Sequence, residues 1–263
     1  MATAAIGELV REWRAQRRRS QMDLALDVGV STRHLSFVET GRSTPSPELV
    51  LALADHLDVP LRARNTMLVA AGYAPRFPQH DLDAEPMRAA RRALTRMLDA
   101  HDPYPGVVID RQWNVVSANR AAQGLLADVP TEVLTPRPNV FRVCLHPDGL
   151  APRTVNFEEW ATYLLNQIRR TLVITADDGL AAIEAEILTY PNLPGPGRRP
   201  TVADWSDPPL LVPFRLRVGT GELSLFTTLT TFGTPRDVTL DELAVELFYP
   251  ADDATEAALR RGA

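Results

Sequence analysis

One stretch organises the N-terminal quarter of this chain: Ser20-Gln21-x-x-Leu24-Ala25-x-x-x-Gly29-Val30-Ser31-x-x-x-Leu35-Ser36-x-x-Glu39-x-Gly41-Arg42. Ser20 and Ser31 are good N-cap residues, because a serine hydroxyl accepts a hydrogen bond from a free N–H of the first helical turn. The pattern therefore predicts helices over 21–28 and 32–39. Gly29 supplies a tight turn between them, since glycine adopts a positive φ at little cost.

Three further helices are predicted around this pair. Ile6, Leu9, Val10 and Trp13 form one apolar stripe at helical spacing, which predicts a helix before Ser20. After the prolines at 45 and 47, a fourth helix carries an apolar face, and a fifth is predicted over 62–71, ending at Gly72. Five short helices with a glycine turn between the second and the third predict an all-α helix-turn-helix domain over residues 1–76.

The quoted motif resembles the lambda-repressor-like helix-turn-helix of the xenobiotic response element (XRE) family, over residues 6–73. The resemblance implies a DNA-binding transcription regulator whose third helix enters the major groove of double-stranded DNA. It places Thr32, Arg33 and Phe37 where such proteins read bases, and an arginine is suited to guanine. The DNA-binding candidates are Gln21, Ser31, Thr32, Arg33, Ser36, Phe37, Arg42 and Ser43.

Gln21 begins the second helix, where an amide and free N–H groups suit a phosphate. Arg42 and Ser43 are expected to contact the DNA backbone, and Glu39 to be structural, because DNA would repel an acid. The alternative is a small helical bundle that binds protein. Charge favours DNA: residues 1–76 carry a net +2, whereas the whole chain carries −5.

Composition excludes several other classes. No run of apolar residues is long enough to span a bilayer. The N-terminus has its apolar residues before its charges, the reverse of a signal peptide, so we expect a cytoplasmic protein without membrane insertion. Cys144 is the single cysteine and all 28 basic residues are arginine, which excludes an internal disulfide, a cysteine zinc site and lysine chemistry.

The remainder predicts a second domain. A proline-rich linker is expected over 77–86, an α+β domain over 87–250 and a helical tail over 251–263. A helix over 87–101 carries an arginine-rich face, which we interpret as solvated rather than as extra phosphate contact. The strand, turn and strand over 105–118, followed by a helix from Asn119, resemble the opening of a PAS domain.

Residues 86–250 resemble the MmyB-like ligand-binding domain found behind this class of helix-turn-helix. The matching stretches are Asp110-Arg-Gln-Trp113, Arg137-Pro-Asn-Val-Phe141, the helix from Trp160 to Arg169, Glu222-Leu-Ser-Leu-Phe226 and Thr231-Phe-Gly-Thr234. The resemblance implies a PAS-like curved antiparallel sheet with helices over one face, and a cavity for fatty-acid-like molecules. The Pro/Gly segment 191–200 departs from the pattern and is expected to lengthen a lid.

A sheet closed by helices forms an apolar hollow suited to a small hydrophobic ligand. Its expected lining is Trp113, Phe141, Trp160, Leu164, Phe214, Leu216, Leu225 and Phe226. Strand alternation directs only some of these residues inward, and any one of them is equally explained as core. The residues considered for a carboxylate headgroup are Arg142, Arg169, Arg170 and Arg215, and the sequence does not choose among them.

Catalysis is not expected. The five histidines are scattered, and neither a nucleophile elbow nor a dinucleotide loop is present. Cys144 and His146 are expected to share one face of an extended stretch, but such a pair needs a third orienting group. No cofactor or metal is expected, apart from a fatty-acid or lipid-like effector.

Two functions therefore remain open. One is a DNA-binding regulator that responds to an effector in its second domain, and the other is a regulator whose second domain only dimerises or binds protein. An antitoxin is disfavoured by the length of the chain. One recognition helix contacts few bases, so a homodimer on two half-sites is expected. Operator, target genes and the sign of regulation are not specified by the sequence.

Overall fold

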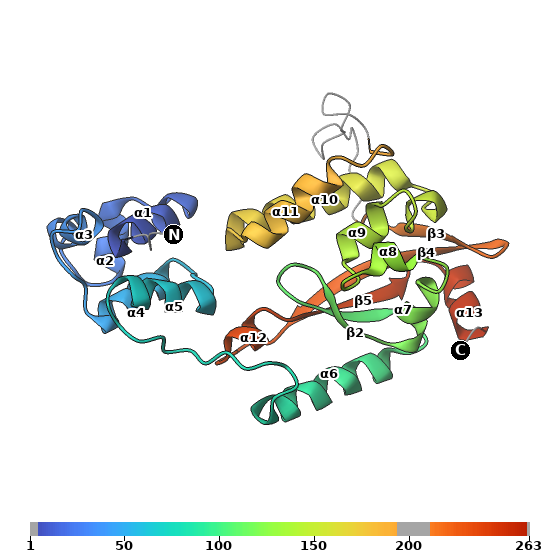
Figure 1. Cartoon of the computed structure of the whole chain (residues 1–263), viewed down its shortest axis with the longest axis horizontal. Coiled ribbons are helices and arrows are strands. Elements are labelled where there is room, and N and C mark those ends of the chain that lie inside the picture. Colours follow the sequence, from blue (N-terminus) through green and yellow to red (C-terminus); the bar gives the residue numbers. More distant parts are fainter. Residues whose placement is uncertain (1–4, 194–210, 262–263) are drawn as a thin grey trace. The chain divides into compact units, whose positions relative to one another are not determined.

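The structure is a computed structural model that describes residues 5–193 and 211–261 (Figure 1). Its contacts divide the chain into two compact units. The first unit comprises Met1–Ala84 together with Gly233–Asp241, and the second comprises Glu85–Phe232 and Glu242–Ala263. The chain therefore passes between the units three times, and the short segment 233–241 belongs to the first unit although both of its neighbours belong to the second.

The first unit contains the five expected helices, α1 (Ile6–Gln16), α2 (Gln21–Asp27), α3 (Thr32–Glu39), α4 (Pro47–His56) and α5 (Leu61–Ala70). The Ser20 hydroxyl accepts a hydrogen bond from the Asp23 amide, and the Ser31 hydroxyl accepts one from the His34 amide, both at 3.1 Å. Gly29 has a φ of 72° between them. Local capping thus positions α3, and buried apolar side chains from α1, α2, α4 and α5 pack behind it.

Segment 233–241 contains α12 (Val238–Asp241), which packs against α5. The Asp241 carboxylate accepts a hydrogen bond from the Leu61 amide at 2.9 Å, at the start of α5. Pro60, the N-cap residue of α5, provides no capping side chain. Asp241, although distant in sequence, therefore acts as the N-terminal cap of α5. It accepts a hydrogen bond from an N–H group that would otherwise have no partner.

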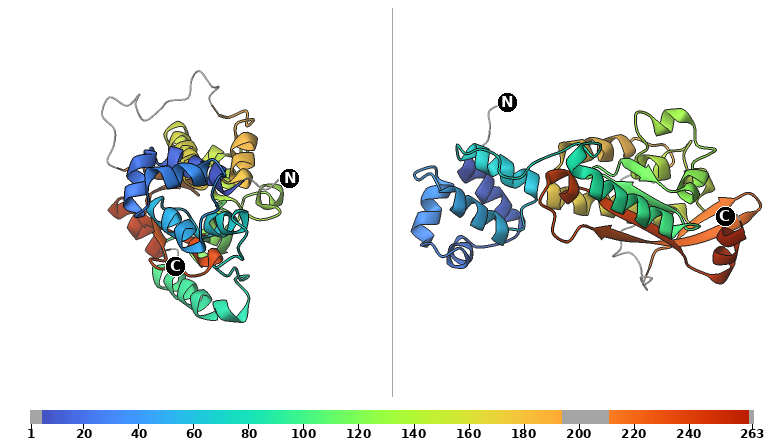
Figure 2. Two further views of the ribbon diagram at one scale, coloured as in Figure 1. Left: turned by 90° about the vertical axis from the view of Figure 1, so that its left-hand side faces the viewer. Right: turned by 90° about the horizontal axis from the view of Figure 1, so that it is seen from below.

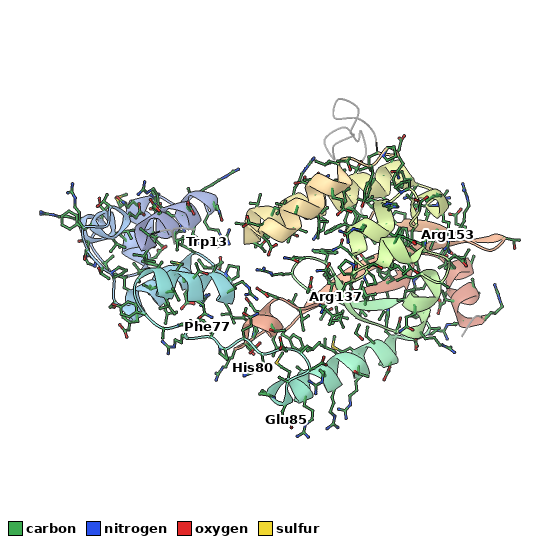
Figure 3. The ribbon with its side chains drawn as sticks, in the orientation of Figure 1. Trp13, Phe77, His80, Glu85, Arg137 and Arg153 are labelled. Carbon is green, nitrogen blue, oxygen red and sulfur yellow. The ribbon has the colours of Figure 1, made fainter. Side chains whose placement is uncertain are left out.

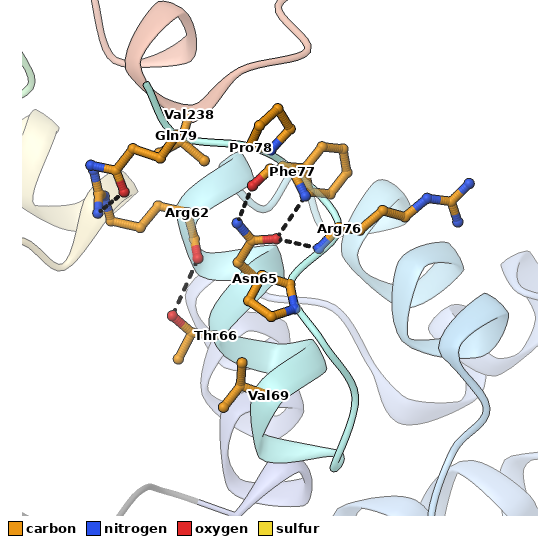
Figure 4. A pocket seen from close by; sticks show the side chains of 10 residues that line it. Arg62, Asn65, Thr66, Val69, Arg76, Phe77, Pro78, Gln79 and Val238 are labelled. Carbon is orange, nitrogen blue, oxygen red and sulfur yellow. Dashed lines mark hydrogen bonds between the residues drawn. The ribbon is translucent and has the colours of Figure 1, made fainter. Parts of the chain in front are cut away.

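Residues 77–80, at the start of the expected linker over 77–86, lie against the first unit. Phe77 lies just after α5 in the chain (Figure 3), where Asn65 holds it. The Asn65 side-chain amide donates to the Phe77 carbonyl at 2.7 Å, and its oxygen accepts from the Phe77 amide at 3.0 Å (Figure 4). His80 Nδ1 lies 2.7 Å from Asp237 Oδ2, and the Thr239 hydroxyl donates to the His80 carbonyl. Residues 77–80 are thus clamped between α5 and segment 233–241.

An open hollow of about 680 Å³ borders this clamp, lined by α5, residues 75–79 and Val238 (Figure 4). Val238 and Asp237 are buried, and the residues that line the hollow are half polar and half apolar. Segment 233–241 is attached to α5 through the hydrogen bond of Asp241 and through the packing of Val238.

The second unit is built on one antiparallel sheet of five strands in the order β2-β1-β5-β4-β3. Its strands are β1 (Gly106–Ile109), β2 (Val115–Ala118), β3 (Phe214–Val218), β4 (Gly221–Thr231) and β5 (Ala244–Pro250). The central strand β5 places Glu246 opposite Val107 of β1 and Leu229 of β4. Residues that stand opposite each other share a face of the sheet, so this register decides which side chains point inward.

Helices cover both faces of this sheet, whereas the resemblance implied one face (Figures 1 and 2). One face meets α7 (Arg120–Leu125), α8 (Thr131–Leu134), α9 (Val140–Leu145), α10 (Phe157–Thr175) and α11 (Asp178–Ile187). Short 3₁₀ turns lie at Glu85–Met87 and Ala151–Arg153. The other face meets α6 (Arg88–His101), whose His101 Nε2 lies 2.8 Å from the Phe248 carbonyl oxygen.

The expected architecture, an all-α helix-turn-helix domain followed by an α+β domain with a curved antiparallel sheet, is confirmed. Helix α13 (Asp253–Arg261) lies in the expected tail and packs on β4 and β5. The lid expected at 191–200 lies mostly outside the described residues. Within the described residues, no helix has the length and apolar character needed to cross a membrane.

Candidate DNA-binding surface and ligand-binding core

Helix α3 presents one face to its packing partners and the opposite face outward. Leu35 and Val38 are buried, whereas Thr32 and Arg33 are exposed and Ser36 and Phe37 are partly exposed. Helical spacing places those four residues on one side, since i, i+1, i+4 and i+5 lie together. The structure thus brings together the four α3 residues expected to face DNA, while Ser31 caps the helix beside them.

Phe37 forms the centre of this surface. The Arg33 guanidinium carbon lies 5.3 Å from the Phe37 ring centroid, and that of Arg42 lies 5.9 Å away. The amides of Arg42 and Ser43 both donate to the Phe37 carbonyl, which keeps the loop after α3 close to the helix. Neither Arg33 nor Arg42 forms an ion pair with any residue in 5–193 or 211–261. Two arginines without acidic partners, held by one aromatic ring, suit a polyanion.

Gln21 and Glu39 belong to a supporting network. Glu39 is 4% exposed and pairs with Arg14 through two contacts of 2.7 and 3.0 Å. The Gln21 side-chain amide donates to the same carboxylate at 3.0 Å. Glu39 therefore ties α1, α2 and α3 together, as expected of a structural acid. The second amide hydrogen of Gln21 and its oxygen are not used in this bond, so Gln21 stays a candidate for a DNA contact.

Asp27, the acid of α2, forms an ion pair with Arg19. Its charge is thereby neutralised within the unit, which removes a source of repulsion from phosphate.

Arg33→Ala is expected to weaken operator binding by about 1–3 kcal/mol and to relax the preference at one base pair, because a bidentate base contact is lost. Arg42→Ala is expected to weaken binding to all DNA sequences by the same factor. It is also expected to make the affinity depend less steeply on salt concentration, because one phosphate contact is lost. Operator titrations at several salt concentrations, with single-base variants, distinguish the two results. An unchanged base preference in Arg33→Ala would contradict this placement of the recognition helix.

In the second unit, seven of the eight expected lining residues share one buried cluster: Trp113, Phe141, Trp160, Leu164, Phe214, Leu216 and Leu225. The Trp160 ring stacks on Phe214 at 4.9 Å, and Trp113 lies 4.6 Å from Phe141. Phe226 is different, because it points to the opposite face. It stands opposite Tyr249, with the rings stacked at 5.4 Å, and Tyr249 contacts His101 of α6.

The turn between β1 and β2 explains how Trp113 reaches this cluster. The Asp110 carboxylate accepts hydrogen bonds from the amides of Gln112 and Asn114, both at 2.9 Å. This tight turn leaves Trp113 with a φ of 65°, a conformation that is unfavourable for a bulky residue. The surrounding hydrogen bonds hold that conformation and direct the indole against Phe141.

Three of the four arginines considered for a headgroup are already paired. Arg142 binds Glu186 through contacts of 2.8 and 2.7 Å, Arg169 pairs with Glu184 at 3.1 Å, and Arg215 pairs with Glu222 at 2.6 Å. Arg170 is exposed on α10; burial raises the pKa of the nearby Tyr163 hydroxyl, and the charge of Arg170 offsets part of that rise. Among the residues that the structure describes, three of the four candidate guanidinium groups are therefore committed to acids of this unit.

The interior instead contains an acid that the sequence analysis did not select. Glu246 is 2% exposed, and burial raises the pKa of its carboxyl to about 7. An acid inside the apolar run 244–248 was the available signal. Cys144 is buried as well; burial and the charge of Glu246 raise the pKa of its thiol to about 12. That thiol stays protonated, which makes it a poor nucleophile.

Cys144 and His146 are not the extended pair expected from the sequence. Cys144 lies in α9, and His146 follows the helix, with its ring edge-on to Tyr190 at 4.9 Å. His146 Nδ1 accepts a hydrogen bond from the Asp148 amide. Within 5–193 and 211–261, no three His, Cys, Asp or Glu side chains gather as metal ligands would.

Two solved structures give distant matches. The clp gene regulator ClgR from Corynebacterium glutamicum is 25% identical, with 39% of this chain and 96% of that chain covered and a TM-score of 0.24. An RNA-binding Light-Oxygen-Voltage receptor is 15% identical, with 98% of this chain and 60% of that chain covered and a TM-score of 0.28. No protein with a curated function matches the chain.

Two family models match, one on each part of the chain. A helix-turn-helix domain matches residues 5–67, which contain the capped helix pair and its exposed face. The MmyB-like transcription regulator ligand binding domain matches residues 90–261, about two thirds of the chain and nearly all of the second unit. The chain therefore belongs to the family of DNA-binding transcription regulators that carry an MmyB-like ligand-binding domain behind a helix-turn-helix.

Proposed function

We propose that this protein is an effector-responsive regulator, in which a long apolar molecule of the fatty-acid class binds the buried cluster of the second unit and changes the affinity of the first unit for its operator. We place this activity in the cytosol, where the DNA lies. The observation that carries the proposal is segment 233–241, which joins β4 to β5 of the ligand-binding sheet and yet belongs by its contacts to the DNA-binding unit.

Burial supplies the affinity for such an effector. Each CH₂ group removed from water contributes about 0.8 kcal/mol, so a chain of about twelve carbons binds without any catalytic group. The aromatic and aliphatic side chains around Trp160 and Phe214 provide an apolar environment of the required kind.

Regulation requires the effector to prefer one state of the protein over another. Strands β4 and β5 both contribute to the face that meets α10, and segment 233–241 is their direct continuation. A shift of either strand acts on Asp241, which caps α5, and on Asp237, which lies against His80. Coupling of this kind typically amounts to about 1–3 kcal/mol.

The proposal is tested by extracting the purified full-length protein with organic solvent and adding back saturated fatty acids of graded length. A thermal shift and a change of about 5-fold or more in operator affinity are expected at the best chain length. Absence of co-purified lipid, of a thermal shift and of any change in operator affinity would favour the second candidate, a domain that only dimerises or binds protein.

Asp241→Ala is expected to reduce the change in operator affinity caused by the lipid, because it removes the side chain that caps α5, a contact that contributes about 0.5–2 kcal/mol. The thermal shift of the second unit and the operator affinity without lipid are expected to remain near their wild-type values. Asp253→Ala, at the exposed start of α13, is a matched control. If Asp241→Ala kept the full change in operator affinity on lipid binding, the signal would take another route, such as α6.

We also propose that the protein binds DNA as a homodimer, since one α3 reads too few bases for a specific site. Sedimentation at micromolar concentration, with and without operator DNA, is expected to show a dimer. A protein that stays monomeric under both conditions would contradict this. A fragment of residues 1–76 does not decide the question, because it lacks both the 77–80 clamp and segment 233–241.

A further inference from the structure

Helix α6 carries a row of positive charge on its outer side. The helix contains four arginines and one acid, Asp99, a net charge of +3 in a chain whose net charge is −5. Arg88, Arg92 and Arg96 follow each other at intervals of four residues, and all three are exposed. Residues four apart lie on one face of a helix, so these three form a single row over two turns. We refer to them as the arginine strip.

The opposite side of α6 is occupied by the second unit itself. Leu94, Leu98 and His101 are buried, and His101 is bonded to the Phe248 carbonyl of β5. The exposed side of α6 presents no large apolar side chain. A helix that lies on a membrane buries its apolar side in the lipid, and α6 has no such side to offer. The arginine strip is therefore a purely charged surface.

The charges of the strip are weakly compensated. Arg88 lies 3.3 Å from Glu85, at the start of α6 (Figure 3), but both side chains are more than 60% exposed (66% and 74%), and such surface pairs contribute little. Arg92 and Arg96 form no ion pair with residues 5–193 or 211–261. The sequence alone favoured a face that meets only water. Three exposed guanidinium groups in one row suit a polyanion instead.

DNA is the polyanion that this regulator already meets. The strip spans about 12 Å of helix, and the same length of duplex presents about seven phosphates. Arg88 follows Ala84, the last residue of the DNA-binding unit before the second unit begins, by only four residues. Such a short tether raises the effective concentration of the strip beside DNA that the first unit has bound. Contacts that are weak by themselves can then add to the affinity.

We propose that the arginine strip of α6 is a second DNA contact, which binds the phosphate backbone beside the bases that α3 reads and has no sequence preference of its own. This inference gives the second unit a direct role in DNA binding, and it does not depend on an effector or on what that effector is.

The test measures the affinity of the full chain for a random-sequence duplex of about 40 bp at several salt concentrations between about 50 and 200 mM. The triple variant Arg88→Gln, Arg92→Gln and Arg96→Gln removes the strip. Its log affinity is expected to depend less steeply on log salt, by about 2 to 3 for each bound protomer, because each phosphate contact contributes about 0.9 to that slope. At the lowest salt its affinity is expected to be at least about tenfold lower.

Two further variants separate the strip from net charge and from folding. The matched control replaces three exposed arginines of α7, β3 and α13 with glutamine, at Arg120, Arg217 and Arg261, and its slope is expected to change by less than about 0.5. Lysine at all three positions of the strip keeps the charge and is expected to keep the slope. Glutamine and lysine have helix propensities close to that of arginine, so all variants are expected to unfold at the wild-type temperature.

Three results would overturn the proposal. The first is an unchanged slope in the glutamine variant of the strip, and the second is an equal change in the matched control, which would reduce the effect to net charge. The third is binding of the wild type to phosphatidylglycerol vesicles that the glutamine variant loses while its DNA slope stays unchanged, which would assign the strip to an anionic membrane surface. A flatter slope confined to the glutamine variant of the strip supports the DNA contact.

Discussion

Glu39→Ala is expected to lower the free energy of unfolding of the first unit by about 3 kcal/mol, near the lower end of the range for breaking a buried ion pair. The variant leaves Arg14 without its carboxylate and removes the acceptor that Gln21 uses. Arg14 is 18% exposed, so water recovers part of the loss, which is why the lower end applies. Domains of this size are only marginally stable, and operator binding is therefore expected to fall with the folded fraction.

The measurement is urea unfolding followed by a signal from Trp13, which is buried on α1, with operator titration in parallel. Glu12→Ala, an exposed acid on the same helix as Arg14, is the control and is expected to change stability by less than about 0.5 kcal/mol. A loss below about 1 kcal/mol in Glu39→Ala would show that the Arg14 pair is not a structural tie between the three helices.

The second large effect concerns Glu246 and pH. Burial raises the pKa of its carboxyl from 4.5 to about 7, so the folded protein holds a proton that the unfolded chain releases at lower pH. This stabilising contribution is complete below about pH 4.5 and is lost as the pH rises to about 7, beyond which it is constant. The full loss is at most about 3 to 4 kcal/mol, since one pKa unit corresponds to about 1.4 kcal/mol.

Glu246→Gln has no such titration. The free energy of unfolding of this variant minus that of the wild type is therefore expected to increase between about pH 4.5 and 7 and then to level off. Taking the difference removes groups with the opposite slope, such as Glu186, whose pKa is lowered by its bond to Arg142 and which loses stability as the pH falls. A difference that does not change across this window would mean that the Glu246 carboxyl is well solvated in the folded state.

The helix pair that begins at Ser20 was predictable from sequence because its determinants are local. Ser20 caps α2 through Asp23, and Ser31 caps α3 through His34, each three residues away. Gly29 takes the positive φ that its position requires. Such interactions form within one turn of chain, so residue type and spacing specify them without knowledge of the rest of the fold. The exposed face of α3 follows from the same periodicity.

Interior positions of the sheet were only partly predictable. Leu225 and Phe226 are neighbours of similar character, and both were expected in the ligand-binding core. Adjacent residues of a strand point to opposite faces, so only one of them can be there. The pairing of Leu225 with Phe214 and of Phe226 with Tyr249 decides which one, and that register depends on strands far apart in the sequence.

Long-range contacts also decide the role of the acids. Asp241 caps α5 across 180 residues of sequence, and Asp237 meets His80 across 157. Glu246 differs from the many surface acids only in what the folded chain packs around it. By itself, the sequence determined the helix-turn-helix and the family to which each of the two parts belongs. Both depend on local periodicity and on short motifs of fixed spacing. The attachment of segment 233–241 to α5 and the burial of Glu246 arise from packing between distant segments, and no local pattern encodes such contacts.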